Sequence, residues 1–131
     1  MITFEDILPT LNELFIEKLP ICIEEINKIH NDGLIICPFE NKTILENCQK
    51  LPCFKFELLE AEYIEKDRII ENTVFKFSLE IKTKIGCDSN IMEIIRYTEA
   101  MEVMIRNEKL TFPKIQILKV LKNYVLLKTV L

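Results

Sequence analysis

Residues 73–84 read TVFKFSLEIKTK, and this stretch decides the fold. Apolar and polar side chains alternate along it without interruption. The apolar set is Phe75, Phe77, Leu79 and Ile81, and the polar set is Lys76, Ser78, Glu80 and Lys82. A period of two is that of a β-strand with one buried face. We therefore predict a half-buried strand whose other face meets water or a neighbouring subunit.

The preceding segment, 54–64, reads FKFELLEAEYI and predicts a partner strand. Its alternation changes phase at Leu58–Leu59, and one inserted residue produces such a change, so we expect a β-bulge there. The connection 65–72, EKDRIIEN, is charged and contains no glycine. Tight hairpin turns favour glycine or asparagine, so a longer hairpin loop is expected.

Shorter apolar runs lie on either side of these strands. Residues 34–37 form a brief run that ends at Pro38, which is typical of an edge strand, and the polar stretch 41–52 is interpreted as a connector. In the tail 112–131, alternation predicts either a hairpin turning at Lys122–Asn123 or a single bulged strand. Both interpretations of the tail stay open, although asparagine tolerates the positive φ of a turn.

The N-terminal segment 3–31 has a helical period. Its apolar stripe comprises Leu8, Leu11, Phe15, Leu19, Cys22, Ile26 and Ile29. Thr3 can cap the helix, and Gly33 can end it. Pro20 cannot donate a backbone hydrogen bond, so we expect a kink or a short break there, and Pro9 could mark the true start of regular helix.

A second helix is predicted over 89–107. The expected inward stripe is Ile91, Ile94, Ile95, Thr98, Met101, Met104 and Ile105, and the expected solvent set is Glu93, Arg96, Glu99, Glu102 and Arg106. Four further apolar residues, Met92, Tyr97, Ala100 and Val103, widen the apolar surface beyond one face. A surface helix usually needs a sector of only about 100°. The surplus is explained either by packing on the chain's own sheet or by contact with a neighbouring subunit.

Together these elements predict one α+β domain over residues 1–131. We expect a mostly antiparallel sheet of about four strands with the two helices packed on one face. A chain of 131 residues, 49% of them hydrophobic, is long enough to bury an independent core.

The composition of the chain argues against several classes of function. The net charge of −4 argues against a general binder of nucleic-acid phosphates, which needs clustered basic residues. No uncharged apolar run of about 18 residues is present, so no membrane-spanning helix is expected. The acidic N-terminal stretch MITFEDILPT is unlike a secretory signal, which favours a cytoplasmic protein.

The five cysteines are predicted to be reduced and to bind no metal. Their number is odd, and a cytoplasmic chain of this size does not need disulfides. A metal site would have to gather Cys37, Cys48, Cys53 and His30 from loops, and the Cys48–Cys53 spacing is not that of a zinc knuckle. A third possibility is a thiol enzyme, in which Cys48 or Cys53 would be the reactive thiol.

No catalytic or cofactor-binding motif is found in the sequence. The chain has only Gly33 and Gly86, so no glycine-rich phosphate loop is present. A serine nucleophile elbow is also absent. We therefore expect a protein that is not an enzyme, with no catalytic residue, cofactor or metal ligand.

Three segments carry a resemblance to a known family. They are the helix end NKIHNDG, the strand entry Leu51-Pro52-Cys53-Phe54-Lys55-Phe56, and the strand Phe75–Ile81, followed by the helix Glu93–Asn107. In this order the chain resembles phage tail terminator and tail-completion (head–tail joining) proteins, in the small form encoded by prophages. It departs from them in residues 109–131, which are shorter and more apolar.

The resemblance implies a structural role in virion assembly. Such proteins form a ring of identical subunits, usually a hexamer, that caps the tail tube and joins it to the head connector. The implied partners are other copies of the chain, tail-tube proteins and connector proteins. The location would be the cytoplasm during assembly and then the virion. The alternative is an acidic secretion-type chaperone or a similar α+β protein-binding module.

Two groups of residues are candidates for the subunit interface. The first is the helix flank Met92, Tyr97, Ala100 and Val103. The second is the charged loop Glu65, Lys66, Asp67 and Arg68. Tyr97 is the foremost single candidate, because aromatic residues are enriched at interface centres.

Overall fold

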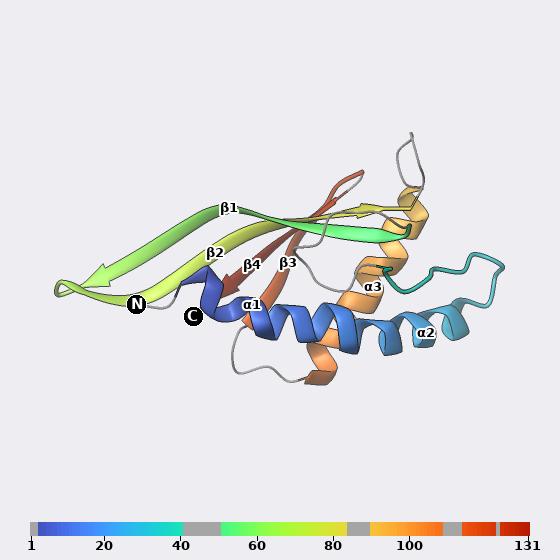
Figure 1. Cartoon of the computed structure of the whole chain (residues 1–131), viewed down its shortest axis with the longest axis horizontal. Coiled ribbons are helices and arrows are strands. Elements are labelled where there is room, and N and C mark those ends of the chain that lie inside the picture. The colour runs from blue at the N-terminus through green and yellow to red at the C-terminus, as the bar shows by residue number, and fades with distance from the viewer. Residues whose placement is uncertain (1–2, 41–50, 84–89, 109–113, 123) are drawn as a thin grey trace.

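The computed structural model describes residues 3–40, 51–83, 90–108, 114–122 and 124–131. Its elements are α1 (Phe4–Asn12), the π-helical turn η1 (Glu13–Lys18), α2 (Leu19–His30), β1 (Cys53–Lys66), β2 (Ile69–Lys82), α3 (Ile91–Glu108), β3 (Lys114–Val120) and β4 (Tyr124–Val130). The strands form one antiparallel sheet in the order β1-β2-β4-β3 (Figure 1).

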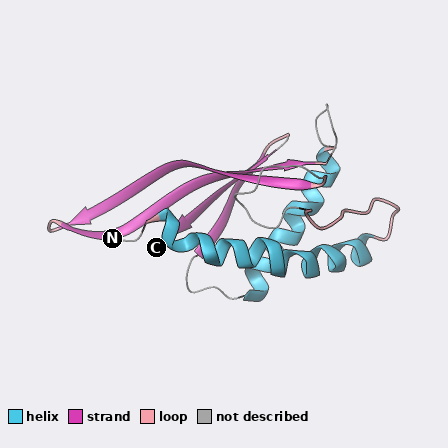
Figure 2. Ribbon diagram, viewed as in Figure 1, coloured by secondary structure: helices cyan, strands magenta, loops and turns pink. Residues whose placement is uncertain are grey.

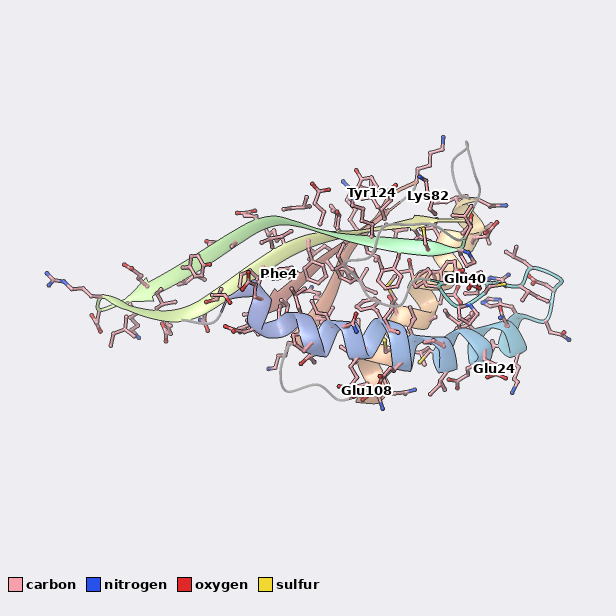
Figure 3. The ribbon with its side chains drawn as sticks, viewed as in Figure 1. Phe4, Glu24, Glu40, Lys82, Glu108 and Tyr124 are labelled. Atoms are coloured by element: carbon pink, nitrogen blue, oxygen red, sulfur yellow. The ribbon has the colours of Figure 1, made fainter. Side chains whose placement is uncertain are left out.

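The α+β prediction is confirmed. The helices cover one face of the sheet (Figure 2), and the residues predicted to line that face, Phe75, Phe77, Leu79 and Ile81, are all buried. On the opposite face, Tyr124 and Lys82 point away from the helices (Figure 3). One face of the sheet is therefore open in the single chain, as the alternation in β2 predicted.

The N-terminal helix runs from α1 through η1 into α2 with no break at Pro20, where the sequence predicts a kink or a short break. At its start, Thr3 N donates to Asp6 Oδ2 at 2.7 Å. Just before Pro20 the helix widens, and Leu19 N donates to Leu14 O, five residues back. A π-helical turn gives the proline ring room inside a continuous helix. Pro9 lies inside α1 and does not mark its start.

The β1–β2 hairpin confirms one expectation and corrects another. The strand register shifts between Leu58 and Glu60, so the predicted bulge is present at Leu59. The longer hairpin loop is wrong, because Lys66 pairs with Ile69 and only Asp67 and Arg68 turn the chain. Both turn residues have positive φ, 54° and 66°, as a tight two-residue hairpin turn requires.

The C-terminal segment is a hairpin, not a single bulged strand. β3 pairs antiparallel with β4, and the register shifts between Ile117 and Lys119. Thr129 Oγ1 also donates to Lys114 O at 2.8 Å. Asn123, the expected turn residue, lies outside the described residues.

Residues 34–37 do not form the expected edge strand. The side chain of Asn27 takes the place of a strand partner: its amide nitrogen donates to Ile36 O at 2.8 Å, and its oxygen accepts from Ile36 N at 3.0 Å. The run is therefore fixed to α2 rather than to the sheet. The connector 41–52 lies outside the described residues except for Leu51 and Pro52.

The cysteines depart from prediction at one position. Cys53 is disulfide-bonded, so the expectation that all five are reduced is wrong, whereas Cys22 and Cys37 are free. Burial raises the pKa of the Cys22 thiol. Cys48 and Cys87 lie outside the described residues.

Candidate assembly surfaces

The β1–β2 hairpin extends beyond the rest of the sheet. Strand β2 pairs with β4 only from Val74 to Glu80, so the two strand segments within residues 63–72 pair only with each other among the residues that the structure describes. We call this segment the arm. Figure 1 shows it projecting past the start of α1 and the end of β4.

The arm places apolar side chains in water. Tyr63 is 42% exposed, Ile64 40% and Ile69 69%. A two-stranded hairpin with no covering layer is marginally stable at best in water. A partner that covers these side chains would stabilise the arm by removing their apolar surface from water.

The charged candidates occupy the tip of the arm. Glu65, Lys66, Asp67 and Arg68 are all exposed. The structure thus brings the loop candidates together at the outer end of the β1–β2 hairpin (Figure 1). Their role in an interface stays a prediction.

The helix-flank candidates are not brought together on an outer surface. Met92 is 45% exposed, but Tyr97 and Ala100 are buried, and Val103 is half-buried against the core. These two buried side chains therefore offer no surface to a neighbouring subunit in the folded chain.

Residues 31–40 are the reason that Tyr97 is covered. Its ring stacks on Phe39 with centroids 4.9 Å apart, and its hydroxyl donates to Cys37 O at 2.6 Å. Burial raises the pKa of the Tyr97 hydroxyl, which therefore stays protonated and able to donate. The surplus apolar surface of α3 is thus used partly within the chain, by a segment that has no regular secondary structure.

The buried face of α3 is also rotated from the predicted one. Ile91 and Ile95 are exposed, whereas Arg96, expected in solvent, is only 4% exposed. Arg96 donates to both carboxylate oxygens of Asp32, at 2.5 and 3.3 Å, and to Leu34 O at 3.3 Å. Sequence reasoning missed this pair because the residues are far apart and Asp32 lies in a segment without periodicity.

A second polar contact fixes the same region. His30 Nε2 lies 2.7 Å from Glu99 Oε2, so the end of α2 is tied to the middle of α3. With the Asp32–Arg96 pair, it holds residues 30–34 against α3.

We expect the Asp32–Arg96 pair to make stability depend on acid pH. The hydrogen bond from Arg96 lowers the pKa of Asp32 to about 2, below the value of about 3.9 typical of an unfolded chain. The unfolded state therefore binds more protons between these values. The stabilisation is complete above about pH 4 and is lost as the pH falls toward 2.

Urea denaturation of the wild type and of Asp32→Asn at several pH values tests this. The difference between their midpoints should be largest at neutral pH and shrink toward pH 2. The exposed residue Glu71 provides a control, Glu71→Gln, whose midpoint should follow the wild type throughout. A difference for Asp32→Asn that does not change with pH would contradict the role of the charged pair.

A groove lies between α2 and residues 35–38. Its volume is about 440 Å³, and its lining is mainly apolar: Pro20, Ile21, Ile23, Glu24, Asn27, Ile35, Ile36, Cys37 and Pro38. Ile21 is 65% exposed and Ile35 70% exposed. The free thiol of Cys37 is also exposed there.

The two edges of the sheet differ in charge. β1 carries four glutamates, Glu57, Glu60, Glu62 and Glu65, with two lysines, Lys55 and Lys66. The segment 114–131, which contains β3 and β4, carries four lysines, Lys114, Lys119, Lys122 and Lys128, with no aspartate or glutamate. The sheet therefore has an acidic edge at β1 and a basic edge at β3.

The part of the chain that the structure describes offers neither a cluster of metal ligands nor a membrane-spanning helix. No group of three or more histidine, cysteine, aspartate or glutamate residues there is placed to hold a metal ion. No helix there is long and apolar enough to cross a membrane.

The chain was compared with family models, with curated proteins and with solved structures, and none of the three comparisons found a match.

Proposed function

We propose that this protein is a structural assembly subunit that joins copies of itself head to tail into a ring. The resemblance to phage tail terminators suggests where such a ring would act. The ring would cap a tail tube and meet the head connector, first in the cytoplasm and then in the virion. A ring needs two different complementary surfaces on each subunit and no catalytic group.

The arm is the observation that carries this proposal. Its exposed apolar side chains project from the body of the domain, where a neighbouring molecule can cover both faces of the hairpin. The charged tip would then set register and orientation more than affinity. An arm of this kind supports a role in contact between proteins better than a role in chemistry.

We expect the double variant Tyr63→Ser/Ile69→Ser to remain folded and to lose assembly. Both side chains lie outside the core, so circular dichroism and the denaturation midpoint should change little. The wild type should give a ring-sized mass in light scattering and ring-shaped particles by electron microscopy, and the variant should give a monomer.

Ile29→Ser is the matched control. Ile29 lies on α2 and is 67% exposed, close to the 69% of Ile69, but it is not part of the arm. This control should assemble as the wild type does. If the arm variant assembles normally as well, the arm is not an assembly surface.

The groove favours a second candidate function, that of a chaperone-like binding module. Its apolar lining and exposed Ile21 and Ile35 suit an extended partner segment. A chaperone-like function requires that the protein form a small oligomer, such as a dimer, and bind an unfolded apolar peptide. It also requires Ile21→Asp to abolish peptide binding, whereas a ring subunit should assemble with Ile21→Asp in place.

A further inference from the structure

We propose that the ring closes by sheet extension, with strand β1 of one copy pairing antiparallel with strand β3 of the next. This inference rests on the proposed function and names the surfaces that would carry it. It follows from the strand order, the strand register and the charges on the two edges.

Both edge strands present backbone to a partner. β1 and β3 end the sheet, and among the described residues neither has a strand on its outer side. All neighbouring strands are antiparallel, so chain directions alternate across β1, β2, β4 and β3. A second copy rotated about an axis along the strands would therefore place its β1 antiparallel to β3 and continue the same alternation.

The open face of the sheet matches opposite charges across this junction. Two rows of paired residues cross the sheet: Glu62, Val74, Val130 and Lys114 form one, and Glu57, Ser78, Leu126 and Lys119 form the other. If the next copy continues each row at the same level, its Glu62 stands beside Lys114 and its Glu57 beside Lys119. Opposite charges at facing positions of neighbouring strands are favourable.

The helix-covered face matches apolar side chains across the same junction. One row runs Leu58, Phe77, Leu127 and Ile117, and another runs Phe56, Leu79, Val125 and Val120. Leu58 is 41% exposed and Val120 37% exposed at the two edges, although the members of their rows on the central strands, Phe77, Leu127, Leu79 and Val125, are fully buried. The neighbouring copy would place Leu58 beside Ile117 and so extend the core through the interface.

The charges also disfavour the competing arrangements. Two β1 edges brought together would place glutamates against glutamates, and two β3 edges would place lysines against lysines. Like charges directly opposite each other destabilise a strand pair. The arrangement that remains is heterologous, and a heterologous contact closes into a ring when its rotation allows.

Charge reversal of each edge tests this pairing. The lysine-edge variant is Lys114→Glu/Lys119→Glu, and the glutamate-edge variant is Glu57→Lys/Glu62→Lys. Each variant alone has two edges of the same sign, and we expect each to be monomeric in native mass spectrometry and light scattering. Lys28→Glu on the exposed surface of α2 is the control and should assemble as the wild type does.

Mixing the two variants should restore assembly. The acidic β3 of one variant then meets the basic β1 of the other, and the reverse contact is complementary as well. An alternating ring with an even number of subunits would contain equal amounts of both. Circular dichroism of each variant alone should match the wild type, which separates lost assembly from lost folding.

The outcomes separate this inference from the proposal on which it rests. If the wild type forms rings and neither edge variant disrupts them, or if mixing folded variants restores nothing, edge pairing is overturned and the assembly function stands. If the wild type is monomeric at every concentration, both are overturned.

Discussion

Phe77→Ala is expected to lower the free energy of unfolding by about 3–5 kcal/mol. Phe77 is fully buried at the centre of β2, and its ring lies 5.3 Å from that of Phe56 and 5.9 Å from that of Phe4. Removing it leaves a cavity between the sheet and the first turn of α1. Domains of this size are stabilised by only about 5–15 kcal/mol, so the loss is a large fraction of the total.

Chemical denaturation followed by circular dichroism measures this effect. Leu59→Ala is the control, because Leu59 is 53% exposed at the bulge, and its truncation should change stability by no more than about 0.5 kcal/mol. Equal effects of the two substitutions would show that Phe77 is not at the centre of the core.

Tyr97→Arg is expected to unfold the chain. Tyr97 is 1% exposed, so the new guanidinium would be placed where only a ring and one hydroxyl are accommodated. A buried charge without a partner is strongly destabilising. The stack with Phe39 would also be lost, and with it the cover that residues 31–40 provide for α3.

The variant Tyr97→Phe distinguishes the contribution of the ring to stability from that of the hydroxyl. It keeps the ring but leaves Cys37 O without its donor, which should cost about 1–3 kcal/mol. Denaturation midpoints and near-ultraviolet circular dichroism measure both variants. A Tyr97→Arg protein that is folded as a monomer and has lost only assembly would contradict the structure and restore Tyr97 to an interface.

The regular parts of the fold could be predicted from the sequence. The alternation from Phe75 to Lys82 predicted the C-terminal part of β2 and its buried face, and the change of phase at Leu58–Leu59 located a bulge, because side-chain direction follows directly from strand geometry. The turn at Asp67–Arg68 could not be predicted in this way. Asp67 tolerates positive φ, but Arg68 is an unusual choice for it, and the pairing of the flanking strands determines the turn.

The candidate surfaces were predicted less well, for a physical reason. Whether Tyr97 or Arg96 is buried depends on residues 31–40, and their position is fixed by side-chain hydrogen bonds and ion pairs that leave no periodic pattern. The opposite charges of the two sheet edges could not be predicted either, because they depend on the order of the strands in the sheet. Lys114 and Glu62 are remote in sequence, and only the order β1-β2-β4-β3 places them at the two ends of one row.

The widened helical turn at η1 also has a consequence for the phase of the whole N-terminal helix. The buried residues of α1 and of the first part of η1 are Ile7, Leu11, Leu14 and Phe15, and those of α2 are Leu19, Cys22, Ile23 and Ile26. On a uniform α-helix of 3.6 residues per turn, the two groups would face directions about 90° apart. The extra residue in the turn resets the angular position of α2, so that both groups face the core. The π-helical turn therefore aligns the buried faces of α1 and α2. Inserting or deleting one residue within 13–18 would rotate one of these two helices so that its apolar face turned away from the sheet.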